Sequence, residues 1–139
     1  MAVKTASIKL ETRGEAHLID VTQEVERAVK DSGISEGIVT VFVPGSTAGV
    51  TTIEYESGAI KDFQSAVERI APKNIHYEHD ARWGDGNGYS HIRASLLGPS
   101  LTVPFSSSRL LLGTWQQIVF VDFDNRSRRR ELVIQIMGE

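Results

Sequence analysis

Side chains able to bind a metal ion or transfer a proton are concentrated in one short stretch of the chain. They are His76, Glu78, His79, Asp80, Asp85, Asn87 and His91. On an extended strand side chains alternate between faces, so His79 would point away from His76 and Glu78. We therefore expect the loop 84–88 to bring His79 and His91 together. Two imidazoles beside a carboxylate predict a divalent metal site, for zinc or magnesium, with one position left for water or substrate.

The glycines of the same loop suit a site for an anion. Gly84, Gly86 and Gly88 allow backbone N–H groups to converge, and Ser90 can cap the segment that follows. The sequence GDGNG has neither the spacing of a dinucleotide-binding loop nor the GK[ST] of a Walker loop. A plain multi-turn loop, whose polar side chains bond only to its own amides, is the alternative to both the metal site and the anion site.

A second polar group of side chains follows Gly45. Ser46, Thr47 and Thr51 carry hydroxyls that suit phosphate oxygens, although threonine is also an ordinary strand residue. Glu54 ends an otherwise apolar strand, so its carboxylate must either face solvent or be paired. These residues are the second set of candidate ligands for a phosphate-bearing small molecule.

Trp115 and Gln116 interrupt the apolar segment 109–124, just after Gly113. The glycine marks a bulge or a close approach of another backbone segment. Trp115 can then line a pocket for a flat ring, and a core position is the alternative. We keep both residues as candidates for substrate binding.

Composition excludes several classes of protein. With 139 residues and 40% apolar side chains, the chain is expected to form a single domain, residues 1–139. The net charge of −3 and the lack of a long apolar run argue against a nucleic-acid or membrane partner. Without cysteine there is no disulfide or thiolate site, and without a signal-like N-terminus a cytoplasmic location is expected. The only basic run is expected to be a solvated turn: Arg126, Arg128, Arg129 and Arg130.

Apolar periodicity predicts an α+β fold. The spacing predicts helices at about 21–32 and about 58–71, with Gly33 ending the first and Pro72 stopping the second. Alternating or β-branched segments around them predict strands at the N-terminus, between the helices and through the last third of the chain. We expect a mixed, largely antiparallel sheet or sandwich with two main helices. The segment 91–97 satisfies neither the helix nor the strand period.

Four segments of the sequence resemble the YjbQ-like family. They are VPGSTAGVTTIE, GDGNGYSHIRASLLGPSLTVPF, LLLGTWQQIVFVDFD and RRRELVIQIMGE, and the resemblance extends from about Ile8 to the C-terminus. It implies an α+β domain that assembles into homotrimers. It also implies a secondary thiamine-phosphate synthase activity, which would join a pyrimidine methyl pyrophosphate to a thiazole phosphate and release pyrophosphate. Charge on that leaving group would need a metal, a cation or converging N–H groups.

The resemblance and the side-chain chemistry described above together indicate which residues form the site. The expected catalytic residues are His91, Asp85, Asn87 and Glu54, and the expected metal ligands are His79 and His91. The expected substrate- or anion-binding residues are Ser46, Thr47, Thr51, Gly86, Gly88, Ser95, Trp115 and Gln116. The family pattern has a histidine where this chain has Gly45, so a third imidazole is missing here.

Two other functions are open at this point. One is a metal-dependent hydrolase of a small phosphorylated or amide substrate, in which the same ion would activate water. The other is a non-catalytic trimeric protein that binds a small anion or metabolite, because a site that only binds needs the same groups as a catalyst. Self-association is also expected from the long apolar strands near the C-terminus, since their edges must be covered.

Overall fold

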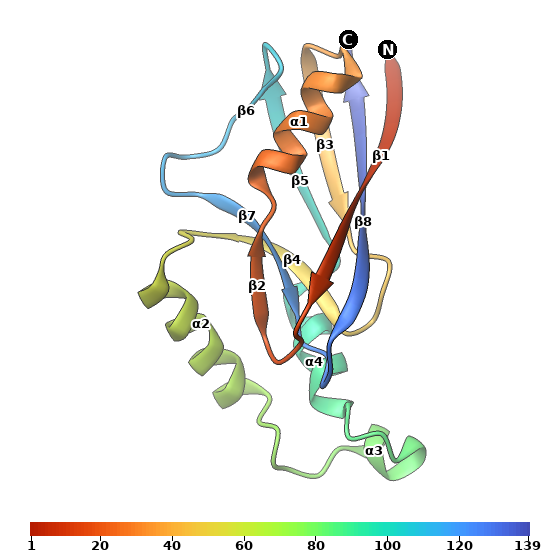
Figure 1. Cartoon of the computed structure of the whole chain (residues 1–139), viewed down its shortest axis with the longest axis vertical. Helices are drawn as coiled ribbons and strands as arrows, with labels where there is room; N and C mark the ends of the chain where they lie inside the picture. The colour runs from red at the N-terminus through yellow and green to blue at the C-terminus, as the bar shows by residue number, and fades with distance from the viewer.

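The chain folds into two antiparallel sheets accompanied by four helices (Figure 1). The computed structural model describes all residues, 1–139. The strands are β1 (Ala2–Thr12), β2 (His17–Asp20), β3 (Glu36–Phe42), β4 (Ala48–Ile53), β5 (Ser100–Ser106), β6 (Arg109–Leu110), β7 (Gln117–Asp122) and β8 (Arg128–Gly138). The helices are α1 (Thr22–Ser32), α2 (Ser57–Ile70), α3 (Glu78–Trp83) and α4 (Gly88–Leu97). The larger sheet has the order β1-β8-β3-β5-β6 and the smaller sheet β2-β7-β4. Every strand pair is antiparallel, which confirms the predicted α+β class.

The larger sheet, the smaller sheet and α1 enclose the main hydrophobic core. Val25 and Val29 of α1 pack there with Ile134 of β8 and Phe120 of β7. The opposite face of the smaller sheet covers a second core, where Val119 of β7 meets apolar residues of α2 and α4. β7 is therefore buried on both faces, as its uninterrupted apolar sequence requires.

The two helices predicted from apolar spacing are α1 and α2. α1 ends at Gly33, whose φ of 74° is the left-handed conformation expected after a last helical turn. The carboxylate of Glu56 caps α2 by accepting hydrogen bonds from two backbone N–H groups of its first turn. The predicted boundaries, about 21–32 and about 58–71, differ from the observed ones by a single residue at one or both ends.

Two further helices lie between α2 and β5, where the sequence pattern did not predict them. α3 begins at Glu78, so the interpretation of the segment around His76 and Glu78 as a strand is wrong. The undecided segment 91–97 belongs to α4 and is helical. Gly84 and Gly86 have φ values of 67° and 65°, and these left-handed residues turn the chain from α3 into α4. None of the four helices is both long and apolar enough to cross a bilayer.

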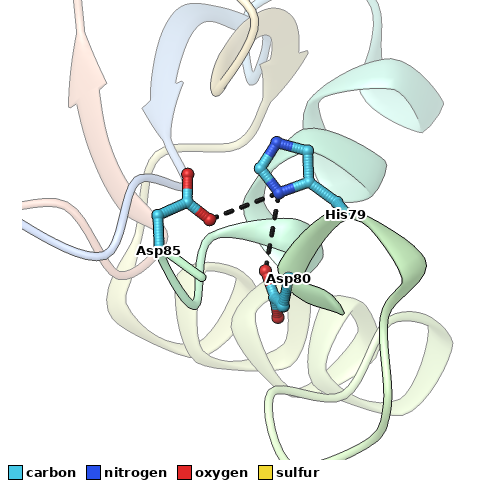
Figure 2. Close-up of side chains that lie close together, drawn as sticks. All are labelled: His79, Asp80 and Asp85. Atoms are coloured by element: carbon cyan, nitrogen blue, oxygen red, sulfur yellow. Dashed lines mark hydrogen bonds and ion pairs between the residues drawn. The ribbon is translucent and has the colours of Figure 1, made fainter. Parts of the chain in front are cut away.

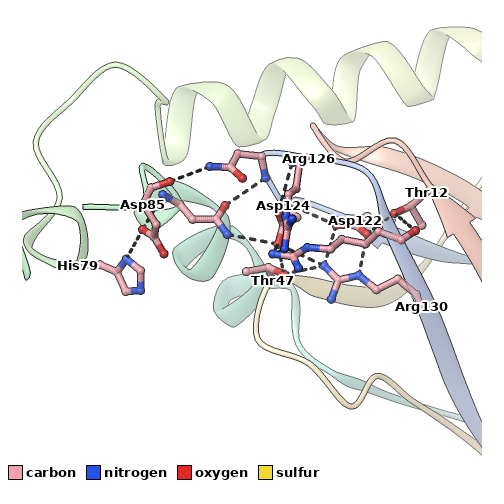
Figure 3. Close-up of polar contacts among 11 residues, drawn as sticks. Thr12, Thr47, His79, Asp85, Asp122, Asp124, Arg126 and Arg130 are labelled. Atoms are coloured by element: carbon pink, nitrogen blue, oxygen red, sulfur yellow. Dashed lines mark hydrogen bonds and ion pairs between the residues drawn. The ribbon is translucent and has the colours of Figure 1, made fainter. Parts of the chain in front are cut away.

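A buried carboxylate joins the two sheets at the end of β7 (Figure 3). Asp122 has no exposed surface and accepts a hydrogen bond from Thr12 Oγ1 of β1 at 2.5 Å. The Nε and Nη2 atoms of Arg130, on β8, lie 2.8 and 3.0 Å from its two oxygens, the two-point geometry typical of an arginine and a carboxylate. Since β1 and β8 belong to the larger sheet and Asp122 to the smaller one, these bonds connect the sheets directly.

A second carboxylate, Asp124, lies just beyond β7 and is equally buried. Thr47 Oγ1 donates to it at 2.9 Å, Asn87 Nδ2 donates at 3.2 Å, and Arg128 Nη2 lies 3.2 Å away. Burial acts to raise the pKa of Asp124, but the hydrogen bonds from Thr47 and Asn87 and the pairing with Arg128 outweigh burial and lower that pKa. Asp124 is therefore held ionised inside the protein.

The lowered pKa makes the contribution of Asp124 to stability pH-dependent. The ionised form stabilises the fold above the ordinary pKa of 3.8, and this stabilisation is lost as the pH falls through the lower folded-state value. We expect Asp124→Asn to lower the free energy of unfolding at pH 7 by about 3 kcal/mol, because Arg128 loses its buried partner. The loss of stability below pH 3.8 should also become shallower.

Urea denaturation at pH 7 and in a series of more acidic buffers measures both effects. Asp62→Asn, which removes an exposed carboxylate of α2, is the matched control and should change the free energy of unfolding by less than about 0.5 kcal/mol. Equal stability and equal pH dependence in Asp124→Asn and the unmutated protein would contradict a stabilising role for the ionised carboxylate.

Candidate metal centre

Three ligand-type side chains meet at the end of α3 (Figure 2). His79 and Asp80 are consecutive residues of α3, and Asp85 follows in the loop to α4. His79 Nδ1 lies 3.5 Å from Asp80 Oδ1 and 3.3 Å from Asp85 Oδ1. One ligand atom from each of the three side chains lies within 4.8 Å of the others. One imidazole and two carboxylates at this spacing can close around a single divalent ion.

The two histidines expected to form the site lie side by side. The ring centroids of His79 and His91 are 4.3 Å apart, with the ring planes tilted by 37°. His91 belongs to the first turns of α4, so the loop with Gly84 and Gly86 does bring the rings together. His76 instead forms an exposed pair with Glu78 at 3.2 Å.

The acidic side chains of the site are held by backbone N–H groups. Asp85 Oδ1 accepts from the N–H of Asn87 at 3.1 Å, and Asp80 Oδ1 accepts from the N–H of Gly88 at 2.8 Å. Gly88 was expected to offer its N–H to an external anion, but Asp80 already occupies that donor. A side chain is excluded at Gly88, because a Cβ atom there would lie 2.6 Å from the Cβ of Tyr77.

Asn87 connects the site to the buried carboxylate of Asp124. Its Nδ2 donates to Asp124 at 3.2 Å, and its Oδ1 accepts from the N–H of Asn125 at 3.1 Å. Asn125 Nδ2 in turn donates to the carbonyl oxygen of Asp85 at 3.0 Å. Both polar atoms of the Asn87 side chain are thus used within the protein, and the residue is buried. The geometry makes Asn87 a residue that positions Asp85.

The other residues expected at the site lie elsewhere. Thr47 gives its hydroxyl proton to Asp124, Thr51 is half-buried within β4, and Ser46 is exposed in the loop before β4. Ser95 lies one helical turn beyond His91 and donates its hydroxyl to the carbonyl oxygen of that residue at 2.8 Å.

A third group of predicted residues lies at the opposite end of β4 from Thr47. Glu54 follows the last residue of β4, and Gln116 Nε2 donates to Thr52 Oγ1 at 3.1 Å. Trp115 is 72% exposed, so it does not occupy the core position that was the alternative for it. The length of β4 separates this group from Thr47 by roughly 20 Å, and the fold does not bring it to His79.

Three acidic residues of the site and its support were not among the expected catalytic residues or metal ligands. Asp80 lies in the dense polar stretch, but the strand interpretation gave no reason to prefer it to Glu78. Asp122 and Asp124 end the apolar sequence VFVDFD, and the argument applied to Glu54 also applies to them. A carboxylate within an apolar strand must be paired, and Arg130 is the partner that the basic run supplies.

Comparisons with known proteins agree on the family of this chain. Residues 6–139 match the family model described as UPF0047 protein YjbQ-like. A UPF0047 protein of Archaeoglobus fulgidus is 37% identical over 126 residues, covering 91% of this chain and 96% of the relative. The crystal structure of a YbjQ-like protein of unknown function from Sulfolobus solfataricus has a TM-score of 0.89 at 29% identity. The match covers 99% of this chain and 100% of that one. The crystal structure of the hypothetical protein APE1520 from Aeropyrum pernix has a TM-score of 0.90 at 30% identity. That match covers 98% of this chain and 99% of the other.

These comparisons correct one expectation and confirm another. The expected thiamine-phosphate synthase activity, and the transferase class with it, is wrong, because the relatives are UPF0047 proteins of unknown function and thiamine-phosphate synthase belongs to a different fold family. The resemblance noted in the sequence is confirmed along nearly the whole chain and in the fold. The chain belongs to the YjbQ-like UPF0047 family.

Proposed function

We propose that this protein binds a divalent metal ion through His79, Asp80 and Asp85. The observation that carries the proposal is the approach of one nitrogen and two oxygen ligand atoms to within 4.8 Å of one another. An imidazole ligand favours zinc over magnesium, which is bound mainly by oxygen. Three protein ligands leave coordination positions for water or a small molecule, and a bound ion supplies positive charge to whatever occupies them.

The surroundings of the three ligands support a prearranged site. Asp80 and Asp85 are each held by a backbone N–H group, so binding an ion does not require them to be ordered first. Asn87 ties the Asp85 loop to Asp124, and such outer hydrogen bonds usually strengthen metal binding. His91 packs against the imidazole of His79 and limits the orientations of that ring.

We further propose that copies of this chain associate through α2 and α4. Although α2 has an apolar stripe, none of its residues is fully buried in a single chain. Ile70 of α2 is 67% exposed, and Leu96 of α4 is 66% exposed. Phe63, Ile70 and Leu96 line an apolar groove of about 160 Å³ between the two helices. A second copy is the partner we propose for this surface, with the homotrimer implied by the family resemblance as the expected stoichiometry.

Removal of His79 tests the metal site. We expect His79→Ala to weaken zinc binding at least about 10-fold, because it removes the only nitrogen ligand of the three. His76→Ala removes an exposed imidazole three residues earlier and should leave the affinity unchanged. Titration of metal-depleted protein with zinc, followed calorimetrically, gives both affinities.

His91→Ala, measured in the same way, tests the expectation that His91 is also a ligand or supports one. Circular dichroism of each variant establishes that the fold is retained. Equal loss of zinc binding in His76→Ala and His79→Ala, or no measurable binding by the unmutated protein, would refute the proposed centre.

A charge placed in the apolar groove tests self-association. We expect Leu96→Glu to shift the protein from oligomer to monomer, because the new carboxylate would be buried without a partner at the interface. Ser65→Glu adds the same charge to an exposed position of α2 and should leave the mass unchanged. Size-exclusion chromatography with light scattering measures the mass, and a monomeric unmutated protein would rule out this association.

A further inference from the structure

The guanidinium group of Arg130 has one terminal nitrogen without a partner. Nε and Nη2 are bound to Asp122, and Nη2 also donates to Thr47 Oγ1 at 2.6 Å. Nη1 makes no hydrogen bond within the protein, and it is accessible to solvent. The side chain as a whole is only 15% exposed. Arg130 is therefore a fixed guanidinium group, paired with Asp122, that keeps one free N–H edge.

Gly45 leaves space in front of that free edge. A Cβ atom at Gly45 would lie 3.3 Å from Arg130 Nη1, and no other atom would lie within 4 Å of it. Gly45 and Ser46 are both exposed, so the space opens to solvent. Because Gly45 does not have a left-handed φ, the glycine is not required by the backbone conformation.

Two neighbouring backbone N–H groups also lack partners. Just before β4, the N–H of Phe123 donates to the carbonyl oxygen of Thr47 at 2.9 Å. The N–H of Thr47 makes no hydrogen bond in return. Ser46 likewise has no partner for its N–H. Thr47 is only 6% exposed, and a backbone N–H group in so buried a residue is rarely unpaired.

We propose that Arg130 Nη1 and the N–H groups of Ser46 and Thr47 form a binding site for the phosphate group of a small molecule. A fixed guanidinium edge beside unpaired backbone N–H groups is a recurrent arrangement for phosphate oxygens. The nearest carboxylates, Asp122 and Asp124, are already neutralised by Arg130 and Arg128 and by hydrogen bonds. The hydroxyl of Thr47 is committed to Asp124, so it does not contact the ligand.

This phosphate site is independent of the proposed metal centre. Thr47 and Asn87 donate to the same oxygen of Asp124, which therefore lies between the two sites. The two sites share no ligand atoms. Metal-depleted protein is therefore the right material for a test, and failure of one proposal leaves the other standing.

A titration of isotope-labelled protein with inorganic phosphate at low ionic strength tests the site by nuclear magnetic resonance. We expect saturable shifts of the amide signals of Ser46 and Thr47. Gly45→Asp should raise the dissociation constant at least tenfold, because its carboxylate would fill the space and pair with Arg130 Nη1. Gly45→Ala, a smaller change that intrudes on the same space, should weaken binding as well and serves if Gly45→Asp does not fold.

Arg129→Gln is the matched control, because its side chain belongs to the same basic run but is 93% exposed. It should bind phosphate within about twofold of the unmutated protein, since an exposed charge contributes little. A parallel titration uses methyl phosphate. Binding of both probes would indicate a phosphomonoester as the ligand, whereas binding of inorganic phosphate alone would indicate free phosphate. Sodium chloride at equal ionic strength must not reproduce the shifts. Absence of saturation with both phosphates, or equal weakening by Arg129→Gln, would overturn the proposal.

Discussion

The arrangement of this protein depends on two buried carboxylates at the end of one strand. An ionised group without solvent is tolerated only when its oxygens are paired, so every partner of Asp122 and Asp124 has a fixed place. Those partners come from β1, β8, the loop before β4 and the loop before α4. One constraint therefore connects the two sheets and orders the loop that carries Asp85. The candidate metal centre is partly exposed, and it is supported from the interior.

The regular part of the fold could be predicted because its apolar residues follow a single period. α1 and α2 have clear helical stripes, and the strands alternate or form short β-branched runs. Residues 76–98 follow no period, because their apolar side chains face different neighbours and because Gly84 and Gly86 set the turn between α3 and α4. Tyr77 and Gly88 contact each other, and only the folded chain brings them together. The sequence therefore indicated where the irregular segment lies but not that it forms two helices.

The candidate site was partly predictable for the same reason. The proximity of His79 and His91 follows from a loop that must turn, whatever the structure on either side of it. The choice of Asp80 over Glu78 depends on α3 and could not be made from alternation along a strand. Glu54, Trp115 and Gln116 lie far from His79, because shared membership of a family motif does not place residues at the same end of a strand. Family membership established the fold, whereas the activity first associated with it did not follow.

The burial of β7 on both faces makes some helices more costly to detach from the fold than others. The core beneath α1 and the core beneath α2 and α4 share this strand. Detaching either α1 or the pair α2 and α4 would therefore expose one apolar face of β7 to water. α3 contributes no buried residue, and its release would leave β7 covered. Opening of α3 would therefore expose less buried apolar surface than detaching either layer from β7.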